Sequence, residues 1–139
     1  MNAVVLDSFA LIAFLEDEPG REIVEHILDK CLVTGENAFI SVVNWGEVYY
    51  TTFRTKGEKS ARLALDVIRT LPIEIINIEQ ELTFLAAQYK AKHKMSFADA
   101  FAAALAKAKH AELITGDPEF APLGKDIKIR WLAKHTGKK

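Results

Sequence analysis

The sequence predicts an α/β fold in which a five-stranded parallel sheet lies between two layers of helices. Short apolar segments alternate with longer amphipathic ones along all 139 residues, and this alternation is typical of parallel sheets covered on both faces. The first segment, residues 3–6, is continuously apolar, as expected of a strand buried on both sides. We therefore expect a three-layer α/β/α sandwich.

Length and composition predict a single domain over residues 1–139. Half of the residues are hydrophobic and 27% are charged, without repeats or low-complexity stretches. No apolar run approaches the roughly 18 residues that span a bilayer, and the N-terminus lacks the basic region of a signal peptide. We expect no membrane contact and a cytoplasmic location. The single cysteine, Cys31, is expected to be a small core residue.

The net charge of −1 excludes a polycation that holds nucleic acid by bulk charge, so any RNA binding must be local. Positive charge does gather in two places. These clusters comprise Lys90, Lys92, His93 and Lys94, and Lys134, His135, Lys138 and Lys139. Each is compatible with a solvated helix end or tail and with a phosphate-binding rim.

Apolar periodicity and capping residues place the elements in order. Short apolar or β-branched runs predict strands over residues 3–6, 38–40, 73–78 and 112–115, and a weaker one over 127–129. Apolar stripes with helical spacing predict helices over residues 8–15, 21–30, 42–56, 58–70, 79–93 and 96–110.

Several helix boundaries follow from capping and breaking residues. Ser8, Ser41 and Ser96 are natural N-caps, because a serine hydroxyl accepts a hydrogen bond from a free N–H of the first turn. Gly57 and Pro72 are typical of helix ends. The alanine-rich segment that follows Ser96 predicts a helix able to pack closely on the sheet.

Four acidic residues stand at conspicuous positions, although each also has a structural explanation. Asp7 can be a helix start, and Asp99 follows Ser96 at capping-box spacing. Asp117 precedes a proline, as an N-cap often does. Glu47 lies in a largely apolar helix, where a solvent-facing glutamate is also common.

Their joint placement favours a metal site. Two strand ends and two early helix turns can face one crevice at the carboxyl edge of a parallel sheet. Four converging carboxylates repel one another and resist ionisation unless a cation joins them. Mg²⁺ or Mn²⁺ suits such hard oxygen ligands, and no cluster of His or Cys predicts zinc.

The chain resembles the PIN-domain family, specifically the VapC-like ribonuclease toxins of type II toxin–antitoxin systems. The resemblance covers nearly the whole sequence. Its segments are residues 4–8, 41–48, 95–100 and 113–120, which read VVLDS, SVVNWGEV, MSFADA and LITGDPEF. Val48 stands where the family usually has leucine after the glutamate, a conservative departure.

The resemblance implies that Asp7, Glu47, Asp99 and Asp117 form the catalytic and metal-binding quartet. Ser8, Ser96 and Thr115 would give polar support nearby. It also implies a five-stranded parallel sheet, an RNA substrate, a cognate antitoxin protein and frequent homodimers. We expect Asp7 and Asp99 to be the primary metal ligands, Asp117 to complete the site, and Glu47 to bind a second ion or orient the attacking water.

Two other interpretations compete with the nuclease. A phosphoryl-transfer domain also places an aspartate after the first strand, but the haloacid-phosphatase pattern needs a second aspartate where Phe9 stands. A catalytically silent PIN-like module would act through protein or RNA contacts, and retention of all four acids weighs against it. Tyr49, Tyr50 and Phe53 suggest a dimer or antitoxin surface, with core packing expected for at least half of them.

Overall fold

The structure, a computed structural model, describes residues 2–132. The second basic cluster, residues 134–139, lies outside them. Within these residues five parallel strands form one sheet, as predicted, and their order is β3-β2-β1-β4-β5. They are β1 (Val4–Leu6), β2 (Ala38–Ser41), β3 (Ile73–Ile76), β4 (Glu112–Thr115) and β5 (Lys128–Trp131).

Six α-helices and one 3₁₀ helix connect the strands. They are α1 (Ser8–Leu15), α2 (Arg21–Thr34), α3 (Val42–Lys56), α4 (Glu58–Arg69), α5 (Gln80–Lys92), α6 (Phe97–Ala108) and the 3₁₀ helix η1 (Pro118–Leu123). The second helix runs one turn beyond the predicted residue 30. It ends at Gly35, whose φ of 77° gives the left-handed conformation that a helix C-terminus favours.

The N-cap of the first helix is Asp7, and not Ser8 as was predicted from the sequence. Ser8 was expected to be its N-cap, but Asp7 occupies that position and accepts a hydrogen bond of 2.8 Å from the N–H of Ala10. The Ser8 hydroxyl instead donates to the Glu47 carboxylate. One residue thus ends β1 and begins α1, so the strand leads into the helix without a loop.

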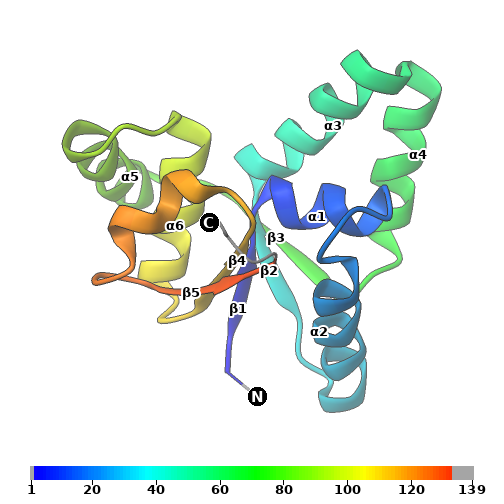
Figure 1. Ribbon diagram of the computed structural model, residues 1–139, viewed down its shortest axis with the longest axis horizontal. Helices are drawn as coiled ribbons and strands as arrows, with labels where there is room; N and C mark the ends of the chain where they lie inside the picture. Colours follow the sequence, from blue (N-terminus) through cyan, green and yellow to red (C-terminus); the bar gives the residue numbers. More distant parts are fainter. Residues whose placement is uncertain (1, 133–139) are drawn as a thin grey trace.

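Helices cover both faces of the sheet (Figure 1). Helices α5 and α6 share one hydrophobic cluster with Val5 of β1, whereas α1, α2, α3 and α4 contribute to a second cluster with Val4 and Leu6. This alternation follows from the two-residue period of a strand. Helix α6 is buried continuously from Asp99 to Ala106, which confirms the close packing that its alanines predict.

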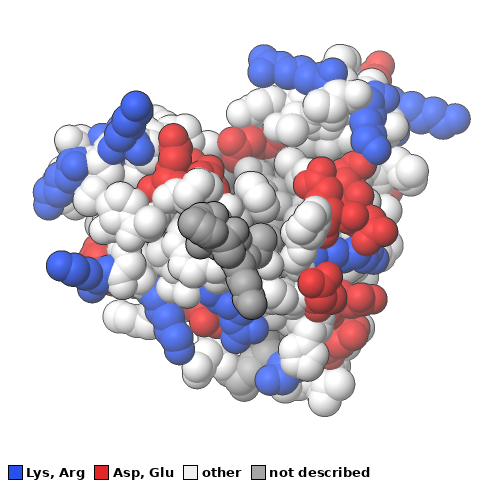
Figure 2. All heavy atoms as spheres, in the orientation of Figure 1, with Lys and Arg blue, Asp and Glu red and all other residues white. Residues whose placement is uncertain are grey.

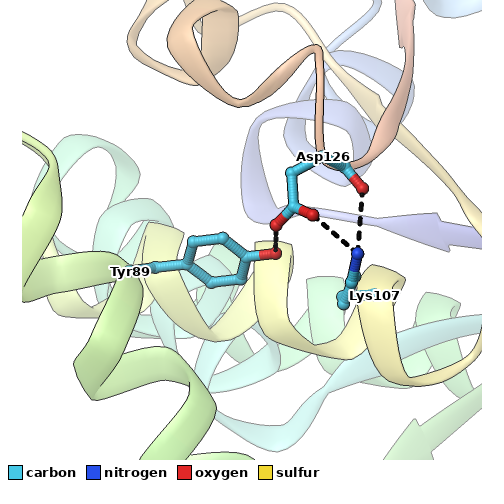
Figure 3. A network of polar contacts seen from close by, with 3 residues as sticks. All are labelled: Tyr89, Lys107 and Asp126. Carbon is cyan, nitrogen blue, oxygen red and sulfur yellow. Dashed lines mark hydrogen bonds and ion pairs between the residues drawn. The ribbon is translucent and has the colours of Figure 1, made fainter.

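At the end of the sheet where β5 begins, a polar network joins α5, α6 and the turn before β5 (Figure 3). The Asp126 carboxylate, in the turn before β5, accepts a hydrogen bond from the Tyr89 hydroxyl of α5. It also pairs with Lys107 Nζ of α6 at 2.6 Å. These two donors, Lys107 first, hold the pKa of Asp126 below its usual value. The network therefore ties the edge strand to both helices.

The structure also tests the predictions for Cys31 and for the aromatic residues of α3. Cys31 is buried, as predicted. The prediction that at least half of Tyr49, Tyr50 and Phe53 pack in the core was wrong, because Tyr50 and Phe53 are 46% and 44% exposed. No helix within residues 2–132 is long and apolar enough to cross a membrane.

The buried centre of the sheet predicts a large truncation cost. Leu6 is fully buried at the end of β1, whereas Leu63 of α4 is 61% exposed. We expect Leu6→Ala to lower the free energy of unfolding by about 2–5 kcal/mol, and Leu63→Ala to change it by about 0.5 kcal/mol or less. Urea denaturation monitored by circular dichroism measures both. Equal losses in the two variants would contradict this account of the core.

Candidate metal centre

A cleft of about 370 Å³ opens at the carboxyl edge of the sheet. Acidic side chains are visible on both sides of this hollow in Figure 2. All four predicted carboxylates line it. The lining residues are Asp7, Ser8, Phe9, Ile12, Glu18, Glu47, Thr51, Ser96, Asp99 and Asp117. The structure thus brings together residues that are up to 110 positions apart, counting from Asp7 to Asp117.

Asp7 is the most enclosed of the four acids, with 1% of its surface exposed. Its Oδ1 accepts a hydrogen bond from the backbone of Ala10, and its Oδ2 accepts one from the Thr115 hydroxyl. Burial raises the pKa of Asp7 to about 7, although both hydrogen bonds oppose that rise. The negative charges of Asp99 and Asp117 add to it. Asp7 is therefore a buried carboxylate that also experiences the negative charges of Asp99 and Asp117.

Thr115 links the ends of the two central strands. Its hydroxyl donates to Asp7 and accepts a hydrogen bond of 3.0 Å from the N–H of Asp117. Asp117 then caps η1, because its Oδ1 accepts a bond of 2.9 Å from the N–H of Glu119. The helix-cap explanation of Asp117 is confirmed, and the same residue still lines the cleft.

Glu47 projects from α3 and is held by side chains of two helices. The Ser8 hydroxyl donates to Oε1 at 2.6 Å, and Asn44 Nδ2 donates to the same oxygen at 3.3 Å. The Tyr50 hydroxyl approaches Oε2 at 3.5 Å. One oxygen is thus fixed firmly, whereas the other has only a long contact.

Asn44 is a site residue that the sequence reasoning missed. Its side chain is fully buried, and it donates to Glu47 and, at 3.1 Å, to the carbonyl of Ala98 in α6. Its Oδ1 accepts a bond of 2.7 Å from Ser41. The available signal was its position three residues before Glu47, on the same helical face and among apolar neighbours.

Asp99 lies at the cleft in the first turn of α6, where the Ser96 hydroxyl accepts a hydrogen bond of 3.0 Å from its N–H. Burial raises the pKa of Asp99 to about 7, with further increases from the charges of Asp117 and Glu47. Among residues 2–132, oxygen atoms of Asp99, Asp117 and Glu119 lie within 4.8 Å of one another. Glu119 was not predicted, although it stands two residues after Asp117.

These three carboxylates suit a divalent metal. Hard oxygen donors at this spacing match the coordination that Mg²⁺ and Mn²⁺ prefer. Burial is the largest cause of the raised pKa of Asp99, and repulsion by Asp117 and Glu119 adds to it. Asp7 is outside this trio, but it lines the same cleft. Asp7, Asp99 and Asp117 also stand at the starts of helical segments, where the helix dipole favours negative charge.

Comparison with known proteins agrees with the family resemblance of the sequence. The PIN domain family model matches residues 4–126. No curated protein sequence matches significantly. Solved structures do match, and one is a toxin–antitoxin complex from Klebsiella pneumoniae at 21% identity and a TM-score of 0.69, covering 95% of this chain and 99% of the other.

Two further structures have the same fold. The VapC20 toxin of Mycobacterium tuberculosis, described as cleaving the sarcin–ricin loop, is 19% identical with a TM-score of 0.65, covering 88% of this chain and 95% of its own. DNA-bound VapBC from Salmonella typhimurium is 16% identical with a TM-score of 0.74, covering 96% of this chain and 100% of the other. At these identities the likeness establishes the fold.

The raised pKa of Asp7 predicts a pH-dependent effect of its replacement. Between pH values of about 4 and 7 the folded state retains a proton that the unfolded state has lost, so wild-type stability declines as the pH rises through this range. Asp7→Asn stays neutral. We expect the stability of Asp7→Asn relative to wild type to increase from pH 5 to pH 8. The upper bound of this increase is about 1.4 kcal/mol for each unit by which the pKa of Asp7 differs between the folded and unfolded states.

Urea denaturation in EDTA at several pH values measures this difference. Asp29→Asn, at an exposed position of α2, is the control and should differ from wild type by the same amount at every pH. A stability difference between Asp7→Asn and wild type that does not change with pH would contradict the burial effect.

Proposed function

Since the chain belongs to the PIN domain family, we propose that it is a Mg²⁺- or Mn²⁺-dependent endoribonuclease and the toxin of a toxin–antitoxin pair. One observation carries the proposal: Asp7, Glu47, Asp99 and Asp117 line one cleft, with Glu119 beside two of them. Burial of these carboxylates, together with their mutual repulsion, costs stability, as the raised pKa values of Asp7 and Asp99 indicate. A cation-dependent activity explains why the chain keeps these carboxylates.

Asp99, Asp117 and Glu119 are proposed to hold the metal together with Asp7, which lines the same cleft and is the most buried of the acids. When bound, the divalent ion lowers the pKa of a coordinated water and offsets negative charge on the phosphodiester. Asp7 has each oxygen engaged by one donor. A carboxylate has about four acceptor sites, so Asp7 keeps capacity for a ligand while its orientation is fixed.

Glu47 is proposed to orient the attacking water and accept its proton. Ser8 and Asn44 fix its Oε1, and the less constrained Oε2 remains available for the water. This division suits a general base, which needs a fixed direction and a free acceptor atom. Hydrolysis with attack on phosphorus and departure of the 3′-oxygen would leave a 5′-phosphate and a 3′-hydroxyl.

The proposed partners follow from the family and from the charge of the cleft. A cognate antitoxin would inhibit the enzyme by placing an arginine or lysine among the carboxylates, where a charge-assisted hydrogen bond forms. A homodimer, a single domain over residues 1–139 and a cytoplasmic location remain parts of this proposal. A catalytically silent module is the alternative, and the nuclease assay below distinguishes it.

The first test is cleavage of structured RNA by the purified chain, freed from any antitoxin. We expect cleavage in Mg²⁺ or Mn²⁺ and none in EDTA. Asp99→Asn and Asp117→Asn should each lower the rate by about 100-fold or more, because replacing a residue that only supports a metal ligand already costs about 10–100-fold. Asp29→Asn should retain wild-type activity. Cleavage that persists in EDTA or in both cleft variants would reject the proposal, and a metal-bound but inactive protein would favour the silent module.

A second test separates metal binding from catalysis and asks whether Glu119 is a ligand. Isothermal titration with Mn²⁺ should give a binding signal in wild type that weakens at least about 10-fold in Glu119→Gln. Glu81→Gln, an exposed glutamate in the first turn of α5, should bind as wild type does. Unchanged Mn²⁺ affinity in Glu119→Gln would restrict the site to the four acids predicted from the sequence.

A further inference from the structure

Phe9 is an aromatic side chain held at the mouth of the acidic cleft. It lies in the first turn of α1, two residues after Asp7, and it lines the cleft together with the acids. Its side chain is 42% exposed, so burial does not account for its position. An isolated exposed phenylalanine needs no special explanation, but this one is also held in place by its neighbours.

The position of the ring depends on a missing side chain at Gly116. A Cβ atom added there would lie only 2.7 Å from Cζ of Phe9, closer than side chains tolerate. Gly116 has no positive φ, so its backbone conformation does not require glycine. It provides space: the phenylalanine ring lies against Gly116, next in the chain to Asp117, which lines the cleft.

Helix α3 carries a cation near Glu47 of the cleft. Tyr50 of α3 places its hydroxyl 3.5 Å from Glu47, and the Arg54 guanidinium lies 5.1 Å from the centre of the Tyr50 ring. Nucleic-acid backbones are bound by such arginines. The exposed ring and the arginine match the two chemical parts of a nucleotide, its base and its phosphate.

We propose that Phe9 is a specificity-determining residue that stacks on an unpaired base next to the scissile phosphate of the RNA substrate. The inference rests on the proposed nuclease function, which places a phosphodiester among the carboxylates. A base attached to the neighbouring sugar then comes within reach of the Phe9 ring. Stacking on aromatic side chains is the usual way in which proteins hold unpaired bases.

The experiment measures RNA binding apart from cleavage, in the Asp99→Asn background with Mg²⁺ present. The probes are a fluorescein-labelled single-stranded octamer of adenosine and an octamer of the same ribose-phosphate length without bases. Fluorescence anisotropy gives the dissociation constant of each. Phe9→Ala should weaken binding of the adenosine octamer about 5- to 150-fold, the range for stacking of one base on an aromatic ring.

Substitutions that keep or remove the aromatic ring define its role. Phe9→Trp should restore most of the affinity, whereas Phe9→Leu keeps an apolar contact with Gly116 and should still bind weakly. Gly116→Ala should displace the ring and resemble Phe9→Leu in affinity. Phe84→Ala, at a 66% exposed phenylalanine of α5, is the matched control and should not change binding. Thermal unfolding of every variant separates lost stacking from lost folding.

The abasic octamer decides between stacking and a general effect on the cleft. Phe9→Ala should leave its affinity unchanged, because the missing base removes the interaction in wild type as well. Equal weakening with both octamers, or unchanged affinity for adenosine, would overturn the inference. So would a Phe9→Ala variant that binds RNA normally but no longer assembles with the antitoxin. Absence of Mg²⁺-dependent cleavage by wild type would instead reject the nuclease proposal, and the anisotropy result would still report on stacking.

Discussion

The parallel pairing of β1 with β4 is the constraint on which the site depends. Leu6 lies opposite Ile114 in this pair, so the next residues along the two strands, Asp7 and Thr115, emerge side by side at the carboxyl edge. The Thr115 hydroxyl then bonds to Asp7 and receives the N–H of Asp117. A shift of one residue in this register would send Asp7 to the opposite side of its strand and separate the two acids.

Burial of the cluster is offset by features of the backbone. Asp7, Asp99 and Asp117 each stand at a helix start, so free N–H groups and the helix dipole partly replace the water that burial removes. This compensation is incomplete, since the pKa values of Asp7 and Asp99 are still raised to about 7. For Asp7 and Asp117 the helix-cap and cleft roles are therefore not alternatives, because each carboxylate accepts a hydrogen bond from a free N–H at a helix start while it lines the cleft.

Much of this arrangement could be predicted because strand ends and caps are local features. An apolar run followed by Asp7 marks the end of a buried strand, and the sheet order then brings distant strand ends together. Asn44 and Glu119 were missed for a different reason. Asn44 matters through its tertiary contact with the Ala98 carbonyl, and Glu119 through the direction in which a 3₁₀ turn points its side chain. Neither property has a sequence period.

The hydrogen bonds divide the acids into two groups with different physical tasks. Asp7 has donors on both oxygens, and Glu47 has two donors on Oε1, so their positions are set before any ligand arrives. Asp117 uses Oδ1 for capping, while its Oδ2 accepts no hydrogen bond from residues 2–132; this acid belongs to the trio with Asp99 and Glu119. Fixed carboxylates define the shape of the cleft, and the trio gathers carboxylate oxygens within 4.8 Å of one another at one point in it. Preorganised neighbours around a cluster of hard oxygen atoms are what a metal-dependent site requires, so the hydrogen bonds and the spacing of the trio together support the proposed metal centre.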